Sequence, residues 1–166
     1  VKEESQMELL VVGSIALDSV KTPFGEKKRI LGGSATHFSV SASMFTPVRL
    51  VGVVGEDFPE EHLDFLRSRR IDLEGLEIAK GKTFHWVGEY GDNLNEAITL
   101  ETHLNVFADF QPKLPENYKK SELVFLANID PQLQMDVLGQ MTGPRFVACD
   151  TMNFWIEGKR ETLWEL

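Results

Sequence analysis

Four short apolar runs, separated by stretches with helical periodicity, most constrain the fold of this 166-residue chain. Each run is continuous and lacks the polar alternation of a strand that faces water on one side. Such runs are typical of parallel strands that helices bury on both faces. The runs are Leu9–Val12, Leu50–Val54, Leu123–Ala127 and Phe146–Cys149. They predict an α/β fold in which a mostly parallel sheet lies between two helical layers.

Acidic or amide side chains follow each of these runs. The carboxyl ends of parallel strands meet at one edge of a sheet, where open α/β sheets bind ligands, so we expect these side chains to converge there. Turn chemistry is the alternative explanation, because Asp and Asn are common where strands end, and we expect at least one of these acids to be structural. The residues are Asp18, Asp57, Asp130, Asp150 and Asn153.

A glycine pair, Gly32-Gly33, precedes a small-residue segment that begins at Ser34. This pattern predicts a tight turn that leads into the N-terminus of a helix. Two glycines let the backbone approach a ligand closely, and a helix start offers free N–H groups to a hydroxyl-rich or anionic molecule. An ordinary strand-to-helix turn is the alternative.

The hydrophobic pattern changes in the middle of the chain. Residues 76–106 contain short, partly alternating segments that predict two or three antiparallel strands. Together with residues 15–31 they are expected to form a small β-rich lid, and an ordinary β-meander insertion is the alternative. Gly81-Lys82-Thr83 lacks the earlier glycine of a phosphate-binding loop and is interpreted as a turn.

Composition narrows the function classes. A net charge of −9 argues against a nucleic-acid or anionic-membrane surface. A single cysteine, Cys149, excludes an internal disulfide and is expected to be a core thiol in a reducing compartment. No apolar run is long enough to span a membrane, and the polar start, residues 1–5, has no signal-peptide pattern, so we expect a cytoplasmic protein. The four histidines show no spacing that suggests a metal site.

The order of these motifs resembles the amino-terminal half of PfkB-type (ribokinase-like) carbohydrate kinases. The resemblance consists of Gly-Ser-x-x-x-Asp at residues 13–18, Gly32-Gly33 before a helix, and Val-Gly-x-Val-Gly-x-Asp at residues 51–57. It runs from Leu9 to the end of the chain, although members of the family are considerably longer. It implies a three-layer, Rossmann-like fold in which residues 1–166 form the substrate-binding part and the sequence is truncated before the nucleotide-binding half.

The same resemblance suggests roles for individual residues. Asp18 and the backbone of Gly32 and Gly33 would hold sugar hydroxyls, and His37 stands where the family usually has asparagine. Asp130 matches an acidic position that contacts substrate. Glu89 would face the sugar from the lid, although alternation alone leaves open whether Glu89 or Tyr90 points inward. Asp150 and Asn153 would lie near the nucleotide.

The family's catalytic Gly-Ala-Gly-Asp turn does not occur in this sequence. The resemblance therefore implies that no catalytic residue is present and that the base would lie beyond Leu166, the last residue of the chain.

The complete enzyme would use ATP and Mg²⁺ to phosphorylate a hydroxyl of a sugar or related polyol. We expect this chain to retain neither cofactor and, lacking a base, to be inactive alone. A non-catalytic module that binds a sugar or nucleoside is the alternative. A homodimer through the lid or through an exposed sheet edge is also consistent with the sequence.

Overall fold

The computed structural model describes residues 7–166, so the polar start of the chain lies outside the described residues. The four apolar runs form strands of one five-stranded parallel sheet in the order β5-β4-β1-β8-β9. Their bounds are β1 Leu9–Val12, β4 Val48–Gly55, β5 Ile71–Ala79, β8 Leu123–Leu126 and β9 Phe146–Cys149. The parallel core predicted from the apolar runs is therefore confirmed.

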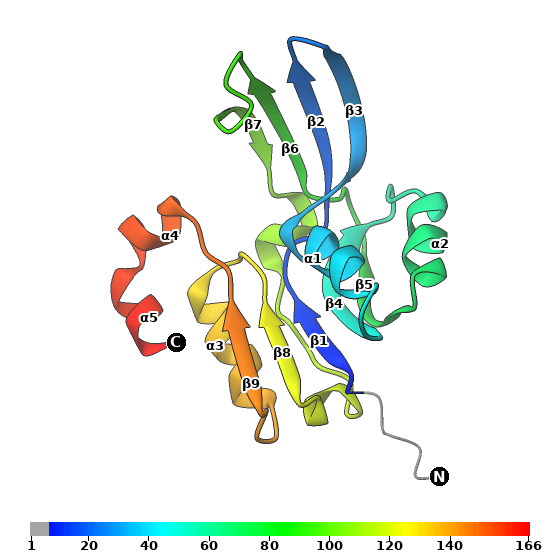
Figure 1. The fold of residues 1–166 in the computed structure, drawn as a ribbon, viewed down its shortest axis with the longest axis vertical. Coiled ribbons are helices and arrows are strands. Elements are labelled where there is room, and N and C mark those ends of the chain that lie inside the picture. The colour runs from blue at the N-terminus through cyan, green and yellow to red at the C-terminus, as the bar shows by residue number, and fades with distance from the viewer. Residues whose placement is uncertain (1–6) are drawn as a thin grey trace.

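Helical segments cover both faces of this sheet (Figure 1). Alternate residues of β1 supply two separate cores, with Val11 in one and Leu10 and Val12 in the other. The first core packs against α1 Ser34–Ala42 and α2 Glu60–Ser68. The second packs against α3 Pro131–Gln140 and the short turns η1 Asn105–Asp109 and η2 Tyr118–Lys120. The helices α4 Asn153–Gly158 and α5 Arg160–Glu165 follow β9.

A second sheet of four strands, which we call the small sheet, stands clear of the main sheet (Figure 1). Its order is β3-β2-β6-β7, with β2 Ala16–Thr22, β3 Gly25–Gly32, β6 His85–Tyr90 and β7 Ala97–His103. The predicted combination of a three-layer parallel α/β unit with a small β-rich unit is confirmed. The pairing inside the small sheet is only partly antiparallel, because its two central strands, β2 and β6, run parallel.

The prediction that Leu76–Ala79 belongs to the β-rich unit is wrong. These residues end β5, which pairs in parallel with β4 at the edge of the main sheet. An edge strand has one strand neighbour, so many of its side chains remain exposed and its sequence alternates like that of a half-buried strand. The second segment of the small sheet therefore begins at His85, not at residue 76.

The expected core thiol, Cys149, is exposed. Its strand, β9, pairs with β8 and forms the other edge of the main sheet as described over residues 7–166. Phe146 is 61% exposed and Val147 is 37% exposed on the same strand. The apolar flanks of Cys149 resemble those of a buried strand, but a flanking sequence does not report whether a further strand lies alongside.

Asp57 joins the small sheet to the carboxyl end of β4. One carboxylate oxygen accepts hydrogen bonds from the backbone N–H (2.7 Å) and hydroxyl (2.8 Å) of Thr83, and the other accepts one from Arg29 (2.9 Å). Burial alone would raise the pKa of Asp57, but the bonds from Arg29 and Thr83 outweigh it and lower the pKa below its usual value. This is one of the strand-end acids, and its hydrogen bonds give it a structural role.

The buried Thr83 hydroxyl also accepts a hydrogen bond from the backbone N–H of Gly55 (3.0 Å). Thr83→Val keeps the shape of the side chain but leaves this N–H and one Asp57 oxygen without the hydroxyl. We expect the free energy of unfolding to fall by about 1–3 kcal/mol, measured by chemical denaturation. Thr102→Val, at an exposed position on β7, is the control and should change stability by less than about 0.5 kcal/mol. Equal stabilities for the two variants would contradict a stabilising role for the Asp57–Thr83 contact.

Candidate functional site

The β2–β3 hairpin brings Asp18 and Gly32 together. The two strands pair antiparallel, with Asp18 opposite Ile30 and Ala16 opposite Gly32. A Cβ added to Gly32 would overlap the Asp18 carboxylate, so only glycine leaves room for this acid. Asp18 lies within β2 and not directly beyond β1, because the chain crosses into the small sheet at residues 13–15. The sequence therefore predicted the neighbourhood of Asp18 but not its strand.

Gly33 directly precedes α1 and has a φ of +95°. That backbone conformation disfavours other residues, and an added Cβ would lie 2.8 Å from the Cα of Ile15. The turn therefore depends on glycine for both its conformation and its packing. It places the Gly33 backbone N–H beside Asp18, whereas the N–H groups of Ser34 and Ala35 donate to Ser14.

Burial raises the pKa of the Asp18 carboxyl above its usual value, while the nearby His37 ring and the backbone N–H of Gly33 act to lower it. His37 is exposed on the first turns of α1. The structure thus brings Asp18, Gly32, Gly33 and His37 into one cluster, as the sequence predicted. A half-buried carboxylate beside backbone N–H groups suits a ligand that donates several hydrogen bonds.

Three polar residues that sequence reasoning did not select lie beside this cluster. The Ser14 hydroxyl accepts a hydrogen bond from the Ser34 backbone N–H (3.1 Å) and lies 3.0 Å from the Ser34 hydroxyl. Ser34 in turn donates to the backbone carbonyl of Asn128 (3.3 Å). The side-chain oxygen of Asn128 is buried and has no hydrogen-bond partner among residues 7–166. The position of Asn128 at the end of an apolar run was the available signal.

Asp130, expected to contact substrate, is occupied by contacts within the chain. It precedes α3 as the N-cap residue and accepts a hydrogen bond from the Gln132 backbone N–H (3.0 Å). Lys159 donates to both carboxylate oxygens, at 3.0 and 2.7 Å. Asp130 therefore fixes the junction of α4 and α5 against the start of α3. A direct substrate contact would require this ion pair to open.

Asp150 and Asn153 lie beyond the carboxyl end of β9 and are exposed. The Asp150 backbone N–H donates to the carbonyl of Leu126 (2.8 Å), and its own carbonyl accepts from Gln134 (3.1 Å). These bonds hold the backbone at the same sheet edge as Asp130 and leave the Asp150 carboxylate and the Asn153 amide at the surface. Their predicted proximity to nucleotide stays a prediction.

Leu166 follows α5 and packs, partly buried, against the second core. Its backbone N–H donates to the carbonyl of Thr162 (3.1 Å), so the helical hydrogen bonding continues to this residue. Leu166 therefore has a packing role and is not a site residue. The resemblance places the catalytic base beyond Leu166, and that position stays a prediction.

Glu89 lies on the opposite face of the small sheet from Asp18. In the β2–β6 register Asp18 pairs with Trp86 and Lys21 pairs with Glu89, and side chains alternate faces along a strand. Glu89 accordingly forms an ion pair with Lys21 (2.8 Å) at the surface. Tyr90 falls on the face of Asp18. The sequence left open whether Glu89 or Tyr90 faces the site. The strand register places Tyr90 on the face of Asp18, so Glu89 does not join the Asp18 cluster.

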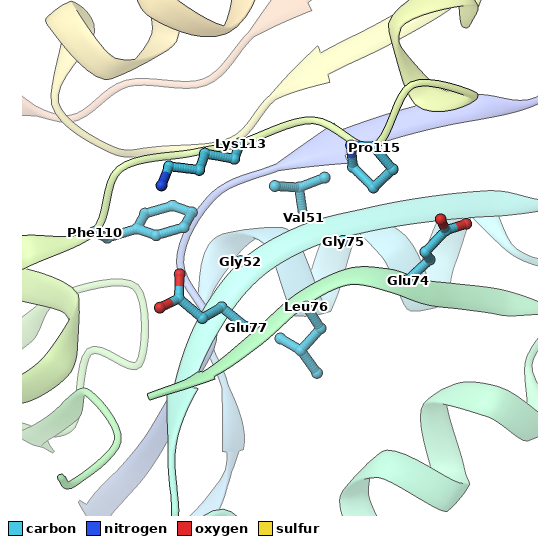
Figure 2. Close-up of a pocket in the computed structure, with 9 residues that line it drawn as sticks. All are labelled: Val51, Gly52, Glu74, Gly75, Leu76, Glu77, Phe110, Lys113 and Pro115. Carbon is cyan, nitrogen blue, oxygen red and sulfur yellow. The ribbon is translucent and has the colours of Figure 1, made fainter. Parts of the chain in front are cut away.

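Two hollows lie elsewhere on the molecule. One, of about 170 Å³, lies between β4, β5 and the segment before η2, with the carboxylates of Glu74 and Glu77 at opposite ends (Figure 2). The other, of about 400 Å³, lies on the small sheet and includes Val20 and Ile30. The first contains none of the residues that the sequence singled out as a site. The residues lining it are Val51, Gly52, Glu74, Gly75, Leu76, Glu77, Phe110, Lys113 and Pro115.

Within residues 7–166 no group of three or more His, Cys, Asp or Glu side chains is arranged to hold a metal ion. Over the same residues, every helix is too short or too polar to cross a membrane.

Comparisons with known proteins agree with this fold. No family model matches the sequence. The chain is 29% identical over 140 residues to a cytidine kinase of Thermococcus kodakarensis, an alignment that covers 84% of this chain and 50% of that protein. It superimposes on a nucleoside kinase of Methanocaldococcus jannaschii, an archaeal member of the ribokinase family, with a TM-score of 0.74 and 19% identity, over 96% of this chain and 57% of that one.

A ribokinase from Cryptococcus neoformans in complex with ADP gives a TM-score of 0.70 at 18% identity, over 96% of this chain and 55% of that one. The ribokinase-like fold predicted from the sequence motifs is therefore confirmed. The chain spans about half the length of these relatives.

The raised pKa of Asp18 predicts a measurable effect on stability. An acid whose pKa is higher in the folded state binds more protons there than when unfolded, so the free energy of unfolding falls as pH rises through that range. Asp18→Asn removes this cost, and we expect it to raise Tm at pH 7 relative to the wild type. The difference should shrink as pH falls toward 3.8, the usual pKa of the group, and should be absent below it.

Thermal melts between pH 3 and pH 7 measure this effect. Asp92→Asn, which changes an exposed acid, is the matched control and should not change the slope of Tm against pH. A lower Tm for Asp18→Asn than for the wild type at pH 7 would mean that the carboxylate stabilises the fold and is not held for a ligand.

Proposed function

We propose that this chain, which has the ribokinase-like fold, supplies the acceptor-binding half of a kinase that transfers a phosphoryl group from ATP to a hydroxyl of a sugar or nucleoside. The observation that carries this proposal is the Asp18 carboxylate held against the Gly32-Gly33 turn at the start of α1. The likeness to a cytidine kinase, a nucleoside kinase and a ribokinase supports the reaction class.

Each part of the Asp18 cluster has a use in holding a polyol. The ionised carboxylate accepts hydrogen bonds from two neighbouring hydroxyls, and such charge-assisted bonds are stronger than neutral ones. The backbone at Gly32 and Gly33 lets a ligand approach without meeting a Cβ. The half-buried setting that raises the pKa of Asp18 also strengthens these bonds by excluding water.

Among residues 7–166 no three acidic, histidine or cysteine side chains gather into a metal site. The sequence up to Leu166 also contains no Gly-Ala-Gly-Asp turn to supply a base for the acceptor hydroxyl. We therefore assign the acceptor's binding and orientation to this chain, and no step of the phosphoryl transfer itself. The second candidate is a non-catalytic module that binds a sugar or nucleoside through the same Asp18 cluster.

One experiment tests the proposal. Purified chain with ATP, Mg²⁺ and cytidine or ribose should release no ADP above the background without protein, because the base and the anion-binding turn are missing. Isothermal titration calorimetry should still detect cytidine binding. Asp18→Asn should weaken that binding about 10- to 100-fold, since a hydrogen bond to a charged group is worth about 1.5–3 kcal/mol.

Asp92→Asn is again the control and should bind cytidine as the wild type does. Robust ADP release would contradict the predicted inactivity. Unchanged affinity in Asp18→Asn would contradict the role of Asp18, and with it the proposed function.

A homodimer is the partner that we propose besides the acceptor. Exposed apolar side chains occur at both candidate surfaces, with Phe146 on β9 61% exposed and Phe24 in the β2–β3 turn 88% exposed. Light scattering at increasing concentration should give a mass that rises toward twice the chain mass. The variant that abolishes this rise, Phe146→Lys or Phe24→Lys, identifies the contact. A monomer mass at every concentration would contradict the dimer.

A further inference from the structure

Asp18 lies between two apolar side chains on one face of the small sheet. In the register of the strands its neighbours are Ile30 on β3 and Trp86 on β6. Residues paired across adjacent strands direct their side chains to the same face, so all three share the face that carries the candidate site. Ile30 is 41% exposed, and Trp86 is half-buried. A ligand held by Asp18 therefore meets apolar surface directly beside the carboxylate.

The indole of Trp86 is held against the sheet by two contacts. Its six-membered ring lies over Gly88, where an added Cβ would come within 2.5 Å of Cζ3 and closer still to two other ring carbons. Its Nε1–H donates a hydrogen bond to the hydroxyl of Thr99 on β7 (3.1 Å). One face of the ring is thus covered by backbone, and the ring's orientation is fixed before any ligand arrives.

Trp86 belongs to neither of the two hydrophobic cores. The hollow of about 400 Å³ on the small sheet is lined by other residues, and these include Val20 and Ile30, which share the face of Trp86. Val20 pairs with Gly88 in the register, so it flanks the ring from the neighbouring strand. An oriented aromatic plane with apolar neighbours, next to a polyol-binding carboxylate, has a geometry suited to a ligand that has both a polyol and a flat unsaturated ring.

We propose that Trp86 is a specificity-determining residue that stacks on the base of a nucleoside whose ribose hydroxyls bind Asp18. This inference rests on the proposed function and narrows its acceptor from sugar or nucleoside to nucleoside. Thr99 and Gly88 are positioning residues, because they act on the acceptor through the orientation of the indole.

Calorimetry with two probes tests the inference. Cytidine carries both ribose and base, whereas methyl β-D-ribofuranoside carries the same sugar without the base. The wild type should bind cytidine more tightly. Trp86→Ala should weaken cytidine binding about 5- to 150-fold, the range expected for loss of one aromatic–base stack, and should leave the affinity for the riboside within about twofold.

Gly88→Ala is the second variant, because it keeps the tryptophan but places a Cβ where the ring lies, and it should also weaken cytidine binding selectively. It decides the question if Trp86→Ala does not fold, as judged by thermal melting. Trp164→Ala removes an indole that is 80% exposed on α5 and should change neither affinity. Asp18→Asn should weaken both probes.

The outcomes separate the two proposals. Equal affinity of the wild type for the two probes, or an equal loss for both in Trp86→Ala, would overturn the stacking role while leaving the role of Asp18 intact. If neither probe binds, or if Asp18→Asn leaves both affinities unchanged, the proposed function fails and the stacking role fails with it.

Discussion

The close approach of the Asp18 carboxylate to the Gly32-Gly33 backbone is the constraint on which the candidate site depends. A side chain at position 32 would occupy the space of the carboxylate, and one at position 33 would meet the backbone of Ile15. Both glycines are needed because the hairpin must return the chain from the small sheet to the start of α1 within this space. The cost of removing the carboxylate from water is visible in its raised pKa. The rest of the fold must therefore offset the cost of holding this carboxylate, because its own contacts do not.

The small sheet carries the site but contributes only the base of its first two strands, Leu17 and Leu31, to the first core. The position of its remainder therefore depends on a few polar contacts. Asp57 and Thr83 tie the start of its second segment to the end of β4, and Arg29 ties its first segment to the same carboxylate. One acid thus contacts both segments of the small sheet, the first through Arg29 and the second through Thr83. These contacts hold the face that carries Asp18 in place beside the start of α1.

The main sheet could be predicted from the sequence because its signal is local. Continuous apolar runs mark buried parallel strands, and β1 and β8 occupy the predicted runs almost to the residue. The small sheet could not be predicted to the same depth, since its parallel β2–β6 pair joins residues far apart in the chain. The two edge strands were predicted wrongly for opposite reasons. The end of β5 alternates like a half-buried strand and was assigned to the small sheet, whereas Cys149 ends a run typical of a buried strand and is exposed. Which side of β6 faces Asp18 depends on register, which alternation alone does not set.

The strand-end acids show why position along the chain identifies a site edge but not the residues that act there. Asp57, Asp130 and Asp18 all follow apolar runs, yet the first holds a turn and the second pairs with Lys159, 29 residues later in the sequence. Asp18 differs because its carboxylate receives no side-chain cation within hydrogen-bonding distance among the described residues, and its neighbours are glycine backbone, the His37 ring and apolar side chains. A half-buried carboxylate with one backbone donor and no such cation gains from further hydrogen-bond donors. The hydroxyls of a bound acceptor would meet that need, so the energetic imbalance at Asp18 itself favours ligand binding.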